Sequence, residues 1–220
     1  ADGLMRIVLD LQGAQTASRT RGIGRYTMAF ATALVRNRGD HEIVLALNGL
    51  FPETIEPIRE MFRGLLPRDQ IRVWEAPGPI AAGAGNEPRR RRAELIYEAF
   101  LASLNPDVIH LSSLFEGFLD DAVTSIGARG TSVPTSVLLH DLIPLHHPEL
   151  FLEPDAAAAA YYAQKLAYLS RADLILTNSD FTARDARERL PLDGTSVVAV
   201  SAACAPSFRP LAADEPGIAA

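Results

Sequence analysis

The segment MRIVLDLQGAQTASRTRGIGRY, residues 5–26, carries the most informative pattern for the fold. It begins with an apolar run at 6–11, passes through a polar segment to glycines at Gly22 and Gly24, and leads into a helical pattern from Arg25. Glycine lets the backbone approach a ligand closely, and the N–H groups at a helix start attract phosphate. The stretch predicts a strand, a ligand-binding loop and a helix in succession. A plain flexible loop with a glycine turn fits the same residues.

Six more short runs rich in valine, isoleucine and leucine follow the first one along the chain. Strands that are buried on both faces of a parallel sheet have this composition. We therefore expect seven strands, at 6–11, 43–47, 71–74, 108–111, 136–139, 174–177 and 197–200.

Helical patterns separate these runs. They cover 25–38, where Gly39 ends the pattern, 91–104 and 155–171, and Ser179 is placed to cap a helix that runs to residue 190. Strand–helix units joined by right-handed crossovers form an open sheet with helices on both faces. The sequence thus predicts an α/β, Rossmann-like, doubly wound fold with a mostly parallel sheet.

One domain with short flanks accounts for the whole chain. Residues 1–4 precede Met5 and are interpreted as a tag remnant, whereas 5–204 carry the alternating pattern. Residues 205–220 contain three prolines and no periodicity, so we expect a linker toward a further domain. Within the domain, 140–154 is an irregular excursion, a kind of segment that is usually functional or mobile.

Composition argues against several classes of function. The net charge of −6 disfavours nucleic acid, which needs a concentrated basic surface. No segment reaches the length of apolar sequence that a membrane span needs. The single cysteine, Cys204, cannot form an internal disulfide, and this fits a reducing, cytoplasmic location.

A dinucleotide site is the obvious competitor for the glycine segment, but the sequence departs from its pattern. Thr27 stands where the third glycine of G-x-G-x-x-G belongs, and Asn48 and Gly49, rather than an acidic residue, follow the second predicted strand. A nucleotide-sugar site is therefore favoured over a site for NAD.

His140 and Asp141 follow the predicted strand at 136–139 directly. Ligands of open α/β sheets bind along the edge where the strands end. His140 is therefore predicted to be a catalytic hydrogen-bond donor, proton carrier or charge stabiliser, with Asp141 beside it. A purely structural His–Asp pair that caps the loop is the alternative.

Ser112, Ser113 and Glu116 follow the preceding predicted strand. No G-x-S-x-G motif marks either serine as a nucleophile, so we expect loop hydrogen bonds from the serines and a substrate contact from Glu116. His146 and His147 match no metal-ligand spacing, and no metal site is predicted.

Four consecutive arginines at 89–92 open a predicted helix. A solvated helix face explains such a run most simply. The other interpretation is a contact for an anionic lipid-linked acceptor or for membrane headgroups.

Taken together, four motifs resemble the retaining group 1 glycosyltransferases of the GT-B fold, a family that includes bacterial mannosyl- and rhamnosyltransferases of lipopolysaccharide and capsule assembly. They are MRIVLD from Met5, RGIGRYT from Arg21, HDLIP from His140 and TNSDFT from Thr177. The resemblance covers residues 5–210 and implies an N-terminal, acceptor-side domain.

The resemblance also implies roles for individual residues. Gly22, Gly24 and Arg25 would lie against the donor diphosphate and the acceptor. His140 would contact the donor sugar, with Asp141 in support.

Two further points come from the family pattern. Ser179 matches an element that borders the interdomain cleft. The family's P-N-G-V-D-like element is replaced here by residues 201–205, and the domain that would carry its paired glutamates lies outside this sequence.

The function that we expect is retaining transfer of a hexose, with mannose favoured, to a glycan or lipid-linked acceptor. GDP-mannose is the favoured nucleotide-sugar donor, and no tightly bound cofactor is expected. A C-terminal nucleotide-binding domain would be the partner, at the inner face of the membrane or free in the cytoplasm. A non-catalytic sugar- or nucleotide-binding module and a nucleotide-sugar epimerase are the alternatives.

Overall fold

A computed structural model describes residues 3–130 and 133–203 of the chain. In these residues the backbone forms a seven-stranded sheet in which every neighbouring pair is parallel. Each predicted strand is present, with bounds that differ by at most one residue at either end. The strands are β1 (Arg6–Asp10), β2 (Glu42–Asn48), β3 (Ile71–Trp74), β4 (Val108–Leu111), β5 (Thr135–Leu139), β6 (Leu174–Thr177) and β7 (Ser196–Ala199).

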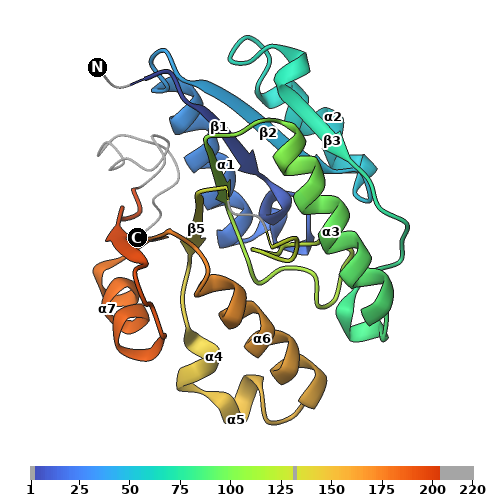
Figure 1. Cartoon of the computed structure of the whole chain (residues 1–220), viewed down its shortest axis with the longest axis vertical. Helices are drawn as coiled ribbons and strands as arrows, with labels where there is room; N and C mark the ends of the chain where they lie inside the picture. The colour runs from blue at the N-terminus through green and yellow to red at the C-terminus, as the bar shows by residue number, and fades with distance from the viewer. Residues whose placement is uncertain (1–2, 131–132, 204–220) are drawn as a thin grey trace, which may run out of the picture.

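The strand order β3-β2-β1-β4-β5-β6-β7 confirms the doubly wound fold (Figure 1). From β1 the chain builds outward to β2 and β3, and from β4 it builds in the other direction. Ile7 of β1 pairs with Ile43 on one side and with Val108 on the other. The order therefore reverses between β1 and β4, where ligands of open α/β sheets bind.

Helices cover the sheet, and the core has two parts. Along β1, Val8 belongs to one hydrophobic cluster and Leu9 to the other, as expected when successive side chains point to opposite faces. The helices are α1 (Gly22–Arg36), α2 (Pro52–Met61), α3 (Glu87–Ser103), α4 (Ile143–His146), α5 (Pro148–Phe151), α6 (Ala156–Leu169) and α7 (Asp180–Arg189).

Helix α1 begins at Gly22, three residues before the predicted start, and ends at Arg36. The two glycines are therefore in its first turn rather than in a loop. A Cβ atom on Gly24 would lie 2.4 Å from the Cα of Arg19, whereas a Cβ on Gly22 would meet no atom within 4 Å. Gly24 is thus required because the 3₁₀ turn η2 (Ala17–Thr20) packs directly on the first turn of α1.

Other boundaries also differ from the prediction. Helix α3 begins at Glu87, because Pro88 suits a first turn, so all four arginines lie inside the helix. The excursion at 140–154 contains the short helices α4 and α5, and α2 was not predicted. The cap at Ser179 is confirmed, since its hydroxyl accepts the Thr182 N–H at 3.1 Å. The predicted linker at 205–220 lies outside the described residues.

Alanine substitutions at the two glycines distinguish the effect of packing on stability from the effect of backbone flexibility. Gly24→Ala should lower the free energy of unfolding by about 2 kcal/mol or more, because its methyl group collides with the Arg19 backbone. Gly22→Ala is the matched control, and it should be neutral or raise stability by about 0.5 kcal/mol. Urea denaturation measures both values. Equal effects of the two substitutions would contradict the packing role of Gly24.

Candidate functional site

A cavity of about 270 Å³ lies where β4 and β5 end, beside the reversal of strand order. Residues from five parts of the chain line it: the loop after β1, the start of α1, the loop after β4, the end of β5 with the segment after it, and α6. They are Ser18, Ile23, Ser113, Phe115, Glu116, Leu138, His140, Asp141, Pro144 and Tyr162.

Glu116 is the buried acid of this cavity. Its Oε2 accepts a hydrogen bond from the Thr16 hydroxyl at 2.9 Å, and its Oε1 accepts one from the Ser113 hydroxyl at 3.1 Å. Burial raises the pKa of Glu116 above the usual glutamate value, although the hydrogen bonds from Thr16 and Ser113 act in the opposite direction. The predicted loop hydrogen bonding of Ser113 is thus confirmed, and its partner is the acid.

His140 follows β5 directly and lies beside the first turn of α1. Its ring meets the ring of Tyr26 edge-on, with centroids 5.6 Å apart. The Thr182 hydroxyl of α7 donates to the His140 carbonyl at 3.3 Å. Burial lowers the pKa of His140, so the neutral imidazole is favoured near neutral pH. Its Nε2 is buried and has no hydrogen-bond partner among the described residues.

The other predicted site residues lie at the same edge of the sheet, but only some of them face the cavity. Asp141 lines it and also accepts the Ile143 N–H at 3.0 Å at the start of α4. Ile23, between the two glycines, lines it as well. Gly22 and Arg25 are exposed and do not line it, and the Ser179 hydroxyl caps α7.

The prediction of a solvated arginine face is wrong for Arg90, which is only 1% exposed. Its Nη1 donates to the carbonyl oxygens of Gly117 at 2.8 Å and Ala122 at 3.2 Å, and its Nη2 donates to the Tyr161 hydroxyl at 2.5 Å. Arg91 pairs with Glu87 at 2.8 Å on the exposed side of α3. Charge runs carry no signal for which member turns inward, so the sequence could not single out Arg90.

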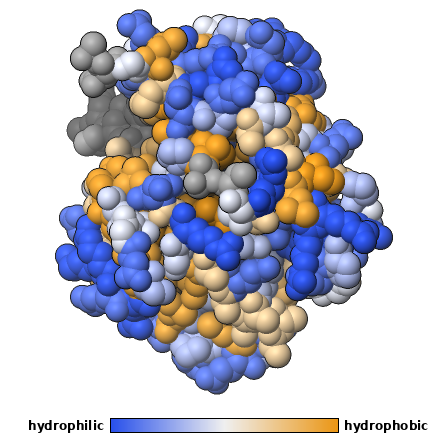
Figure 2. Space-filling view, in the orientation of Figure 1, coloured by the Kyte–Doolittle hydropathy of each residue, from blue (hydrophilic) through white to orange (hydrophobic). Residues whose placement is uncertain are grey.

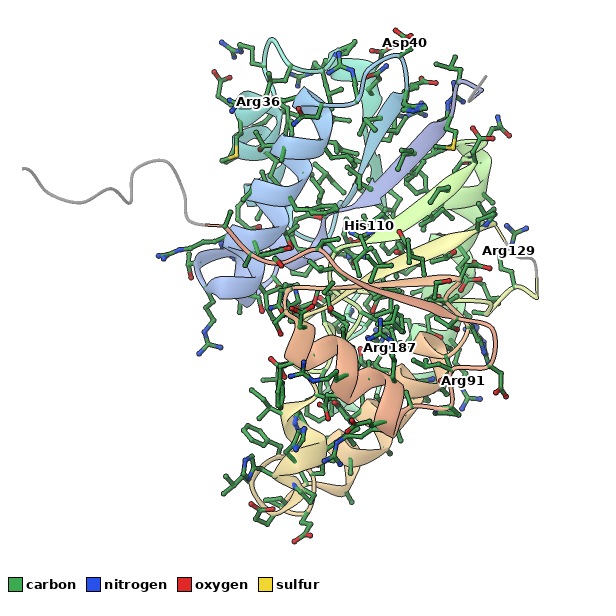
Figure 3. The ribbon with its side chains drawn as sticks, turned by 90° about the vertical axis from the view of Figure 1, so that its left-hand side faces the viewer. Arg36, Asp40, Arg91, His110, Arg129 and Arg187 are labelled. Atoms are coloured by element: carbon green, nitrogen blue, oxygen red, sulfur yellow. The ribbon has the colours of Figure 1, made fainter. Side chains whose placement is uncertain are left out.

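His110 in β4 is a buried histidine that the sequence analysis did not select, and Figure 3 shows it near the centre of the molecule. Its Nδ1 lies 2.8 Å from the Ser136 hydroxyl, and its ring stacks on Phe30 of α1 with centroids 4.9 Å apart. Burial lowers the pKa of His110 to about 4. Its position inside a strand, on the α1 side of the sheet, is the signal that could have identified it.

The described part of the chain contains neither a cluster of three potential metal-ligand side chains nor a helix that could span a membrane. His146 and His147 pair separately, with Asp185 at 2.8 Å and Glu149 at 3.3 Å. Across 3–130 and 133–203, no three His, Cys, Asp or Glu side chains gather as a metal site would require. No helix in those residues combines the length and apolarity needed to cross a bilayer.

Comparison with known proteins agrees with this architecture. A family model described as Glycosyltransferase Family 4 matches residues 20–203, and the chain therefore belongs to this family of glycosyltransferases, as an N-terminal GT-B domain. It is 32% identical to the Escherichia coli serotype-specific mannosyltransferase WbdA over 206 residues. The aligned region covers 93% of this chain and 24% of that relative. A second E. coli protein of that name is 30% identical over 178 residues, 80% of this chain and 22% of the relative. The chain spans about a quarter of the length of these relatives.

His110 should make the fold sensitive to acid. Its folded pKa of about 4 lies below the usual 6.5, so stability is lost as the pH falls from 6.5 to 4, where only the unfolded chain takes up the proton. The loss at pH 4 should be about 3 kcal/mol. His110→Asn removes the titrating imidazole. The difference in unfolding free energy between wild type and variant, from urea denaturation at pH 7 and pH 4, should therefore shift by that amount toward the variant.

The comparison with the variant cancels other titrating groups. Burial raises the pKa of Asp10 in β1 from 3.8 to about 6, so this carboxyl makes stability fall as the pH rises from 3.8 to 6, the opposite trend. Asp10 is present in both proteins and drops out of the difference. A difference that stays constant with pH would show that His110 does not titrate as described.

Proposed function

We propose that this chain is the acceptor-side half of a retaining hexosyltransferase that transfers mannose from GDP-mannose to a glycan or a lipid-linked acceptor. The observation that carries the proposal is the cavity between the loop after β4 and the end of β5, which brings Glu116 and His140 together in a member of Glycosyltransferase Family 4. The family favours a transferase over an epimerase or a binding module, and the mannosyltransferase relatives favour mannose.

The lining of the cavity suits an uncharged sugar. Glu116 and Asp141 contribute carboxyl groups, and none of the described lining residues is a lysine or an arginine. Phosphate would be repelled there, whereas sugar hydroxyl groups can donate to a carboxylate. Phe115 and Tyr162 contribute neighbouring rings with centroids 5.0 Å apart. We propose that the acceptor sugar occupies this cavity, with Glu116 accepting hydrogen bonds from its hydroxyl groups.

The donor diphosphate is proposed to lie toward the first turn of α1. The Arg21 side chain does not cap this helix, and the turn contains Gly22 and Gly24. Free N–H groups and the helix dipole attract anions at such a position. Arg25 is exposed on the same turn and can add positive charge. By the family resemblance, Ser179, which caps α7, would border the interdomain cleft.

In the proposed reaction the acceptor hydroxyl attacks on the face from which the diphosphate leaves, and the leaving diphosphate takes its proton. The protein then contributes positioning and electrostatic stabilisation. His140, which lines the cavity, would contact the donor sugar, and Asp141 would hold the segment after β5 in place.

The proposed enzyme needs a second domain of the same polypeptide to bind the nucleotide, since this chain spans about a quarter of its relatives. We further propose a cytoplasmic enzyme that makes peripheral contact with the inner face of the membrane. The basic contribution to that contact falls to Arg89 and Arg92, which are exposed on α3, because Arg90 is buried and Arg91 is paired. In the view of Figure 1, α6 lies in the lower part of the molecule, and Figure 2 shows hydrophobic residues beside hydrophilic ones over that part.

The first test compares two lengths of chain. The 220-residue chain should not transfer mannose from GDP-mannose to a mannose oligosaccharide, because the proposal assigns nucleotide binding to a second domain. The chain extended by its second domain should transfer it. Radiolabel transfer measures both activities, and turnover by the short chain alone would refute the two-domain requirement.

The second test concerns His140. In the extended protein, His140→Ala should slow transfer by about a hundredfold or more, the usual size of a lost electrostatic or acid–base contribution. His147→Ala is the matched control, since His147 is exposed in the same excursion and does not line the cavity. It should keep the wild-type rate. Wild-type turnover by His140→Ala, with the circular dichroism spectrum unchanged, would remove His140 from the site.

A further inference from the structure

The loop that carries Glu116 is held by side chains rather than by regular backbone pairing. Residues 112–126, which follow β4, form no helix or strand, yet many of them are buried. A buried carbonyl oxygen without a partner is costly, so each needs a donor. Eight carbonyl groups of this loop accept hydrogen bonds from side chains, those of Leu114, Glu116, Gly117, Asp121, Ala122, Val123, Thr124 and Ile126.

Two of these contacts flank Glu116 itself. The Tyr161 hydroxyl of α6 donates to the Glu116 carbonyl oxygen, and the next carbonyl, that of Gly117, accepts from Arg90. Tyr161 in turn accepts from Arg90 at 2.5 Å, so the three residues form one continuous chain of hydrogen bonds. The backbone on the C-terminal side of the Glu116 side chain is therefore fixed from α3 and α6 together.

Steric contacts also restrict the backbone next to Glu116. Gly117 has a φ of 96°, and a Cβ atom there would lie 2.1 Å from the Ala122 carbonyl oxygen and 2.8 Å from the Arg90 guanidinium. The loop thus closes around the guanidinium with no room for a side chain at 117. Arg90 also reaches the Ile80 carbonyl oxygen at 3.3 Å, and its planar, multi-donor head group is what allows one side chain to join several carbonyl groups.

We propose that Arg90 and Tyr161 are positioning residues for the Glu116 carboxylate, and that the acceptor affinity of the enzyme depends on them through Glu116. The proposal rests on the proposed function of Glu116 as the ligand of the acceptor hydroxyl groups. Neither residue lines the cavity, so neither touches the acceptor directly. Their effect is transmitted through the backbone between 116 and 117.

The test is a double-mutant cycle in the extended protein, with GDP-mannose as donor and a mannose oligosaccharide as acceptor. Tyr161→Phe removes only the hydroxyl that links Arg90 to Glu116, so it is milder than any change at Arg90. It should raise the KM for the acceptor about tenfold, the usual effect of losing one buried hydrogen bond, while kcat changes little. In a Glu116→Gln background, the same change should raise the KM by about twofold or less.

Tyr168→Phe is the matched control. Tyr168 is also a buried tyrosine of α6, but its hydroxyl donates to Glu94 of α3 at 2.8 Å rather than to the loop. The two single variants should lose similar stability, and only Tyr161→Phe should change the acceptor KM.

Each outcome decides one question. If Tyr161→Phe has the same effect in the wild-type and in the Glu116→Gln background, its role is structural only, and the positioning proposal fails while the role of Glu116 survives. If Glu116→Gln alone leaves the acceptor KM unchanged, the proposed role of Glu116 fails, and positioning fails with it. An equal rise in KM for Tyr168→Phe would also overturn the proposal.

Discussion

All neighbouring strands of this sheet run in the same direction, and the rest of the molecule follows from that constraint. Parallel strands need a crossover between them, so every strand end is followed by a connection at one edge of the sheet. Because the order reverses between β1 and β4, the connections after these two strands diverge and leave a crevice. Glu116, His140 and Ile23 come from three such connections and meet in one cavity there.

How much of this could be predicted depended on whether the signal was local. The strands follow from runs such as Ile43–Val44–Leu45, because a strand buried on both faces is close to continuously apolar. The position of His140 at a strand end was equally local, as was the Ser179 cap. Helix α2 was missed because its two prolines, Pro52 and Pro57, are signals of a break rather than of a helix.

Features that depend on tertiary contacts could not be predicted. Gly24 looks like a residue of a flexible loop, but the Arg19 backbone beside it gives it a packing role inside a helix. Arg90 looks like its three arginine neighbours, and only the loop around it makes it a buried residue. In both cases the deciding atoms belong to backbone that the local pattern does not describe. The roles of Glu116 and His140 remain predictions of the same sequence analysis, now with a shared cavity to support them.

Burial raises the pKa of Asp10 and lowers the pKa of His110, and together these two shifts affect the number of protons that folding takes up or releases. Near pH 5 the unfolded chain would carry an ionised aspartate and a protonated histidine, whereas the folded core favours the uncharged form of each. Folding therefore moves one proton, in effect, from the imidazole to the carboxyl, and the solvent neither gains nor loses one. Near that pH, these two groups together should therefore make no contribution to the dependence of the unfolding heat on the ionisation enthalpy of the buffer.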